Sequence, residues 1–138
     1  MPASAAAIWA ALADPDSYGF WVVGSKLIRG ADPTWPAPGT KFHHTIGVGP
    51  FTVNDHTCSL QARAPRLLRL RAKGRPLGMA RVTLELTPKD GGTLVRMTET
   101  PDGPTAILSY NPLVHLFTKA RNAESLMRLE QVAMRRDG

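Results

Sequence analysis

Apolar and polar residues alternate along most of the chain between residues 40 and 100, which is the period of a half-buried strand. The expected strands are residues 22–29, 40–48, 51–60, 68–73, 80–87 and 93–100. Short turns separate them, and Asp90-Gly91-Gly92 is typical of a tight hairpin. The pattern predicts an antiparallel meander with one face on a core and the other in water.

Two short helical segments precede the strands. Residues 5–12 are rich in helix-forming residues, and Ser4 is a suitable N-cap. Asp14-Pro15 ends this helix. We expect Asp16 to cap a second helical turn that ends near Trp21.

The longest predicted helix is C-terminal, over residues 111–136, with Asn111 as its cap and Pro112 in its first turn. Counted at about 100° per residue, its apolar side chains form two faces. One face holds Leu113, Leu116, Phe117, Ala120, Ala123 and Met127, and the other holds Leu126, Leu129 and Ala133. Such a helix is packed on two sides or bends near Asn122, and Glu124 and Gln131 are expected in solvent.

These elements predict a single α+β domain over residues 1–138, with a curved sheet wrapped around the C-terminal helix. The length of 138 residues is usual for one domain. No apolar run approaches the roughly 20 residues of a membrane span. A lone cysteine, Cys58, excludes a disulfide framework and favours a cytoplasmic protein.

The net charge of +6 is concentrated between residues 61 and 81. Arginine and lysine recur there without an acidic residue, whereas the rest of the chain is nearly balanced. We expect a solvated outer strand face, where cations also oppose edge-to-edge pairing. The alternative is a docking surface for an anionic partner. No aromatic residue interleaves the cations, so specific nucleic-acid binding through stacked bases is not expected.

Two ionisable residues lie on otherwise apolar strand faces. His44 alternates with Phe42 and Ile46, and Glu99 alternates with Val95 and Met97. Each either orients a ligand or has an ordinary role, as a hydrogen-bonded core histidine or a strand-end carboxylate that reaches water. The neighbouring His43 and His44 point to opposite faces and cannot bind one metal ion together. No metal-binding, hydrolase or phosphate-loop motif is present, so neither metal nor cofactor is expected.

Three segments resemble the START-like, Bet v 1-like helix-grip superfamily, and within it the bacterial polyketide cyclase/dehydrase group (SRPBCC). They are residues 8–15 with Tyr18 and Trp21, residues 92–99, and residues 122–129. The resemblance implies a seven-stranded sheet that grips a long helix around an apolar cavity. Here only three residues precede Ser4, so the usual first strand is missing and six strands are expected. That would leave an edge open to self-association, and we expect an upstream strand to stabilise the chain.

The resemblance implies binding of a small hydrophobic ligand, such as a polyketide, lipid or isoprenoid. The alternatives are a polyketide aromatase/cyclase that catalyses aldol closure and dehydration, and a basic adaptor that acts through residues 61–81. We favour binding over catalysis. For an enzyme, the candidate acid/base residues are Glu99, His44 and Tyr110. The expected lining of the cavity is Trp21, Phe42, His44, Leu70, Leu84, Met97, Glu99, Leu113, Phe117 and Ala120.

Overall fold

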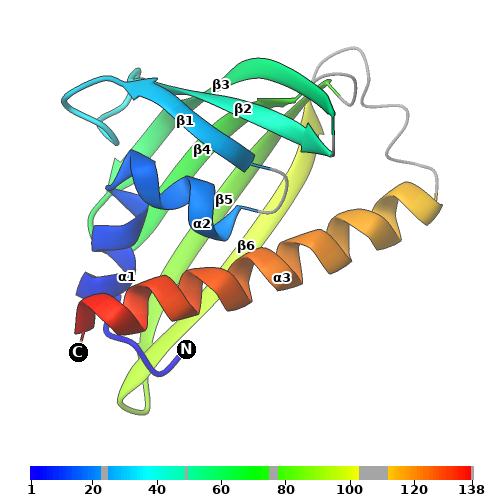
Figure 1. The fold of residues 1–138 in the computed structure, drawn as a ribbon. Coiled ribbons are helices and arrows are strands. Elements are labelled where there is room, and N and C mark those ends of the chain that lie inside the picture. Colours follow the sequence, from blue (N-terminus) through cyan, green and yellow to red (C-terminus); the bar gives the residue numbers. More distant parts are fainter. Residues whose placement is uncertain (23–24, 49, 75–77, 103–111, 138) are drawn as a thin grey trace.

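Six antiparallel strands form one sheet in chain order (Figure 1). They are β1 (Ser25–Ala31), β2 (Lys41–Val48), β3 (Phe51–Arg63), β4 (Leu67–Gly74), β5 (Gly78–Lys89) and β6 (Gly92–Asp102). The computed structural model describes residues 1–22, 25–48, 50–74, 78–102 and 112–137. Within these ranges it leaves out the side chains of residues 25–26, 46–48, 51–53, 73–74, 78–79, 101–102, 112–118 and 136–137. The order and antiparallel pairing of the six strands confirm the predicted meander.

The hairpin between β5 and β6 has the two-residue turn that its sequence predicts. Lys89 pairs with Gly92 across the turn. Asp90 and Gly91 both have positive φ, 47° and 81°. Positive φ at both central residues matches the right-handed twist of the strands and favours Asp-Gly at this place.

The N-terminal helices are α1 (Ala5–Leu12), the 3-10 turn η1 (Pro15–Ser17) and α2 (Tyr18–Trp21). Ser4 caps α1, because its hydroxyl accepts a hydrogen bond of 3.1 Å from the N–H of Ala7. The predicted cap at Asp16 is wrong. Asp14 takes that role by accepting from the N–H of Asp16 at 3.1 Å. Pro15 is suited to the first helical position, which makes the residue before it the cap.

The C-terminal helix α3 (Pro112–Asp137) is continuous and crosses the side of the sheet on which α1 and α2 lie (Figure 1). In its C-terminal half the buried side chains are Ser125, Leu129 and Ala133. Met127 is 54% exposed on the opposite side. The two apolar faces read from the sequence therefore differ in burial here, because only one meets the core. Glu124 faces water, where it pairs with Arg128 at 3.0 Å.

The packed core joins α1, α3 and the middle of the sheet. Its fully buried side chains include Ile8, Leu12, Leu68, Leu84, Leu86 and Leu129. Burying one such side chain stabilises the fold by about 1.5–3 kcal/mol. These contacts fix the C-terminal half of α3 against α1 and against one end of the sheet.

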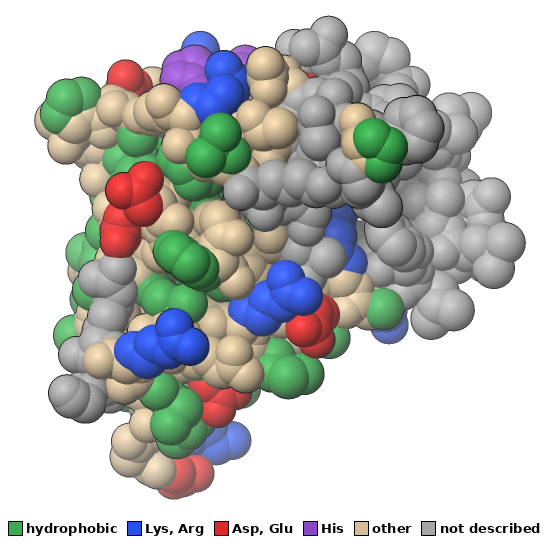
Figure 2. Space-filling view, viewed as in Figure 1, with side chains coloured by type: hydrophobic (Ala, Val, Ile, Leu, Met, Phe, Trp, Pro, Cys, Tyr) green, Lys and Arg blue, Asp and Glu red, His purple; other side chains and the backbone are tan. Residues whose placement is uncertain are grey.

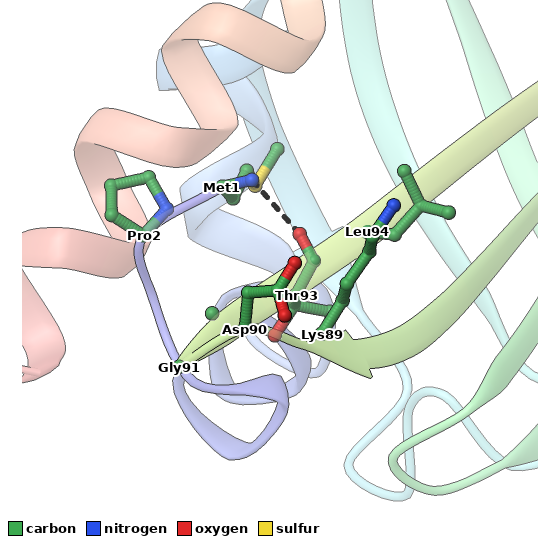
Figure 3. Close-up of a pocket in the computed structure, with 8 residues that line it drawn as sticks. Met1, Pro2, Lys89, Asp90, Gly91, Thr93 and Leu94 are labelled. Carbon is green, nitrogen blue, oxygen red and sulfur yellow. Dashed lines mark hydrogen bonds between the residues drawn. The ribbon is translucent and has the colours of Figure 1, made fainter.

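The N-terminus lies against the free edge of β6 (Figure 3). The ammonium group of Met1 donates to the carbonyl of Thr93, and the N–H of Thr93 donates to the carbonyl of Met1, each at 2.8 Å. Two residues that exchange both hydrogen bonds form an antiparallel pair. Glycine is required at position 92, because a Cβ atom there would collide with the backbone of Met1.

Candidate functional site

The helices all lie on one side of the curved sheet, so the sheet has an inner and an outer face (Figure 1). Cross-strand pairing assigns side chains to the inner face, because directly opposed residues share a face. His44 opposes Asp55, Phe42 opposes Thr57, and Thr57 opposes Ala72. Further along the sheet the inner face continues through Ala80, Val82, Leu84, Leu86, Val95, Met97 and Glu99.

The side chains of the inner face are not buried to the same extent along the strands. Leu68, Leu84 and Leu86 are at most 2% exposed, because α1 and α3 cover them. Ala72 and Ala80 oppose each other further along the same face and remain only half-buried. Two adjacent alanines leave room on a surface where larger side chains would otherwise fill the space. The two alanines are therefore less buried than their inner-face neighbours Thr57 and Val82, which are 5% and 7% exposed.

Aromatic rings lie at the β2 end of the row that contains Ala72, where Phe42 opposes Thr57. The ring of Phe42 lies 4.6 Å from that of Tyr18, 4.8 Å from that of Trp35 and 5.4 Å from that of His44. The hydroxyl of Tyr18 and the indole N–H of Trp35 both donate to the carbonyl of Leu12, at 2.7 and 3.1 Å. Burial raises the pKa of Tyr18, so its phenol stays neutral. These bonds hold the aromatic wall to the end of α1.

His44 is a buried histidine at the polar end of this wall. Its Nε2 atom lies 3.2 Å from the hydroxyl of Thr57. The whole residue is 7% exposed. Burial lowers the pKa of His44, and the negative charge of Asp55 opposes this effect in part. The imidazole is therefore neutral at pH 7, with one nitrogen occupied by Thr57.

Two buried polar atoms of the wall have no hydrogen-bond partner among the residues that the structure describes. They are the indole nitrogen of Trp21 and Nδ1 of His44. Most buried polar groups are paired, and an unpaired one costs about 1–3 kcal/mol. A polar group of a bound molecule at this wall would satisfy such an atom.

An ion pair connects the inner face to α3. Arg121 donates through one nitrogen to both carboxylate oxygens of Glu99, at 2.5 and 2.6 Å. The side chains of Arg121 and Glu99 are 25% and 14% exposed. Glu99 is therefore neither a core residue nor a freely solvated one, and the pair ties β6 to the helix.

The predicted lining residues differ in where the structure places them. Trp21, Phe42, His44, Leu70 and Leu84 are buried, and Met97 and Glu99 are half-buried. Ala120 is exposed, because the buried side of α3 is that of Ser125 and Leu129, so we leave it out of the site. The side chains of Leu113 and Phe117, and all of Tyr110, lie outside the described residues. The sequence did not reveal Asp55, Thr57, Ala72, Ala80 or Arg121 as neighbours of the site.

Two shallow hollows lie elsewhere on the molecule. One, of about 340 Å³, is lined by Met1, Pro2 and residues 89–94 (Figure 3). The other, of about 330 Å³, is lined by Arg63, Arg66, Leu67 and residues 85–87. Neither contains a residue of the predicted lining. Within the described part of the chain, no three His, Cys, Asp or Glu side chains gather as a metal site requires, and no helix is long and apolar enough to cross a membrane.

Comparison with known proteins places the chain among proteins with the same architecture. The family described as polyketide cyclase / dehydrase and lipid transport matches residues 1–133. No curated protein matches the sequence.

Solved structures show the same fold at low sequence identity. A protein from Nitrosomonas europaea superimposes with a TM-score of 0.75 at 16% identity, covering 98% of this chain and 90% of that one. The Bet v 1 homologue Ara h 8.0201 gives 0.72 at 15% identity, covering 96% and 91%. An AHSA1-like protein from Aeromonas hydrophila gives 0.68 at 21% identity, covering 96% and 86%. The architecture is thus the helix-grip fold. At these identities the similarity shows a shared fold and does not show a shared function.

Proposed function

Because the chain belongs to the polyketide cyclase/dehydrase and lipid transport family, we propose that the inner face of its sheet binds a small hydrophobic molecule. The observation that carries the proposal is the half-buried pair Ala72 and Ala80, in the middle of a face whose neighbours Leu68 and Leu84 are sealed. Small side chains on an otherwise buried face provide space for a ligand.

The wall around this space indicates a ligand with an apolar body and a polar group. Leu70, Val82 and Met97 supply apolar contact. Trp21 and His44 each supply a buried nitrogen without a partner among the described residues. Ligand sites combine such apolar lining with a few placed polar groups. A polyketide, a lipid or an isoprenoid alcohol fits this description.

The direct test is native mass spectrometry of freshly purified protein, followed by titration with the neutral fluorescent probe N-phenyl-1-naphthylamine. A neutral probe avoids attraction to cationic surface residues. We expect a copurified hydrophobic molecule or a saturable probe site of one molecule per chain, with displacement of the probe by long-chain alcohols. Protein that carries no ligand and does not bind the probe would contradict the proposal.

A second candidate function is aldol cyclisation and dehydration of a poly-β-keto chain, which the position of His44 directly opposite Asp55 on neighbouring strands favours. A neutral imidazole can remove a proton from a carbon between two carbonyl groups, and the nearby carboxylate stabilises the imidazolium that forms. The enolate then adds to a second carbonyl of the same chain, and the new alkoxide takes up the proton. Loss of water completes the reaction.

The substitution His44→Gln distinguishes the two functions. Glutamine keeps a hydrogen-bonding side chain but is not a base. In a binding protein, the affinity for the neutral probe changes and no turnover of a model β-diketone is found in either form. In a cyclase, turnover by the native protein falls by about 10²–10⁴ in the variant. Turnover that survives the substitution would rule out His44 as the base.

A further inference from the structure

The outer face of the sheet carries a large share of the net positive charge of the chain. Cross-strand pairing aligns Lys41 with Cys58, Cys58 with Arg71, and Arg71 with Arg81, in one row from β2 to β5. Arg69 lies in the next row, opposite Thr83. The row after that runs from Arg63 through Leu67 and Glu85 to Arg96. We call these three rows the cationic face.

The cationic face is solvent-accessible and strongly unbalanced in sign. Lys41, Arg63, Arg69, Arg81 and Arg96 are exposed, and Arg71 is half-buried. Glu85 is the one acidic residue among the described side chains of these rows. The α3 side of the molecule is different, because cationic and anionic side chains are intermingled there (Figure 2). Positive charge is therefore segregated onto the side of the sheet opposite the candidate ligand site.

We propose that the cationic face docks onto the surface of an anionic phospholipid bilayer. Arginine matches phosphate groups through paired N–H donors, and juxtaposed cations attract an anionic leaflet. The exposed side chains Leu60 and Leu94, 37% and 48% accessible, flank the rows and supply apolar contact at the headgroup level. The inference goes beyond ligand binding and does not rest on it.

The same geometry disfavours nucleic acid as the partner. Three strand spacings separate Lys41 from Arg81, which is roughly 14 Å, whereas the major groove of B-DNA is about 12 Å wide. The rows lie on a broad sheet face from which no described helix projects. They also contain no aromatic residue on which single-stranded bases would stack. A broad, diffuse array of cations suits the broad, diffuse charge of a membrane surface.

The test is cosedimentation of the full chain with large unilamellar vesicles of phosphatidylcholine, with and without 30% phosphatidylserine. We expect binding to the phosphatidylserine vesicles alone, and its loss when salt is raised from 50 to 500 mM. The triple variant Arg69→Gln, Arg71→Gln, Arg81→Gln should bind about 100-fold more weakly, since each cation near the surface contributes roughly fivefold. Circular dichroism checks that the variant folds. Lys41→Gln with Arg63→Gln and Arg96→Gln is a second variant, whose exposed positions tolerate the change.

The matched control is Lys119→Gln with Arg128→Gln and Arg135→Gln, which removes the same charge from exposed positions of α3. It should retain most of the binding. Equal weakening by the face and control variants would overturn the proposal, because net charge alone would then explain the attraction. Absence of any preference for phosphatidylserine would also overturn it. Displacement of the protein from the vesicles by a 20-base-pair DNA duplex, added at the same concentration of negative charge as the lipid, would also overturn it.

Discussion

His43 and His44 are adjacent in the sequence but lie on opposite faces of β2. His43 is exposed, whereas His44 is 7% exposed and lies beside Phe42, Thr57 and Asp55. Desolvation disfavours the imidazolium of His44 and is the largest influence on its pKa, which it lowers.

The lowered pKa of His44 predicts a loss of stability in acid. Its pKa in the folded state lies below the unfolded value near 6.5, so the unfolded state takes up the proton first as the pH falls. Stability from this group is full above about pH 6.5 and decreases as the pH falls toward the folded pKa. Urea unfolding at pH 7.5 and 5.5 should show a smaller acid-induced loss in His44→Gln than in the native protein. An acid-induced loss in His44→Gln as large as that of the native protein would refute this account of His44.

Glu99 and Arg121 provide a second prediction at this scale. Glu99→Gln removes a partly buried ion pair between β6 and α3, so we expect a loss of about 1–2 kcal/mol in the free energy of unfolding. Glu124→Gln is the control, because the exposed Glu124–Arg128 pair within α3 contributes about 0.5 kcal/mol or less. Urea denaturation of the two variants measures the difference. Equal effects would show that the Glu99 pair is a surface contact.

The alternating pattern placed His44 and Glu99 correctly on the inner face, but it could not identify Asp55 and Thr57. On β3 one face carries Asp55, Thr57 and Ser59 and the other carries His56 and Cys58. Neither set is apolar, so hydrophobicity does not distinguish inside from outside there. Only the pairing of β3 with β2 assigns the faces. Arg121 was also missed, because its ion-pair partner Glu99 lies far away in the sequence and no local pattern connects the two.

At the scale of elements, β6 is an edge strand, and Met1 pairs with it only at Thr93 among the described residues. Since Thr93 exchanges both hydrogen bonds with Met1, the backbones of Val95, Met97 and Glu99 point to the same edge. Within the described residues no backbone hydrogen bond covers that edge beyond Thr93. A strand fused before Met1 would continue this pairing.

We expect such a fusion to stabilise the chain. A strand of about eight residues with alternating valine and threonine would extend from Met1 toward Pro101. The free energy of unfolding should rise, and self-association measured by light scattering should fall. An extension of the same length with proline at alternate positions is the control, because it lacks the required N–H donors. If both extensions have the same effect, strand pairing at this edge is not the cause.

Elements with strong local signals were predicted well. The Asp90-Gly91 hairpin, the start of α1 at Ser4 and the order of the strands follow from turn chemistry and period. The irregularity between Ser59 and Gln61 in β3 was not predicted, because a bulge depends on the partner strand. The second cap was misassigned to Asp16, although Pro15 indicated Asp14.

For the molecule as a whole, the inner side has an apolar end and a more polar end. The first holds Leu84, Leu86 and Leu129, and the second holds His44, Asp55 and the Glu99–Arg121 pair. The helix-grip fold was predictable, because the segments that resemble this superfamily occur along the chain in the same order as in its members. The polar end was not predictable, because it depends on contacts between residues far apart in the sequence.

The most direct test of the central claim is the affinity for N-phenyl-1-naphthylamine of the native protein, Ala80→Phe and Thr98→Phe. Ala80 lies on the inner face and Thr98 is exposed on the outer face of β6, so the two substitutions add the same ring on opposite sides of the sheet. If the inner face binds the ligand, Ala80→Phe fills the space and weakens probe binding by about tenfold or more, with the fold retained by circular dichroism. Thr98→Phe leaves the affinity unchanged. Unaltered binding by a folded Ala80→Phe variant, or equal loss in both variants, would contradict the account.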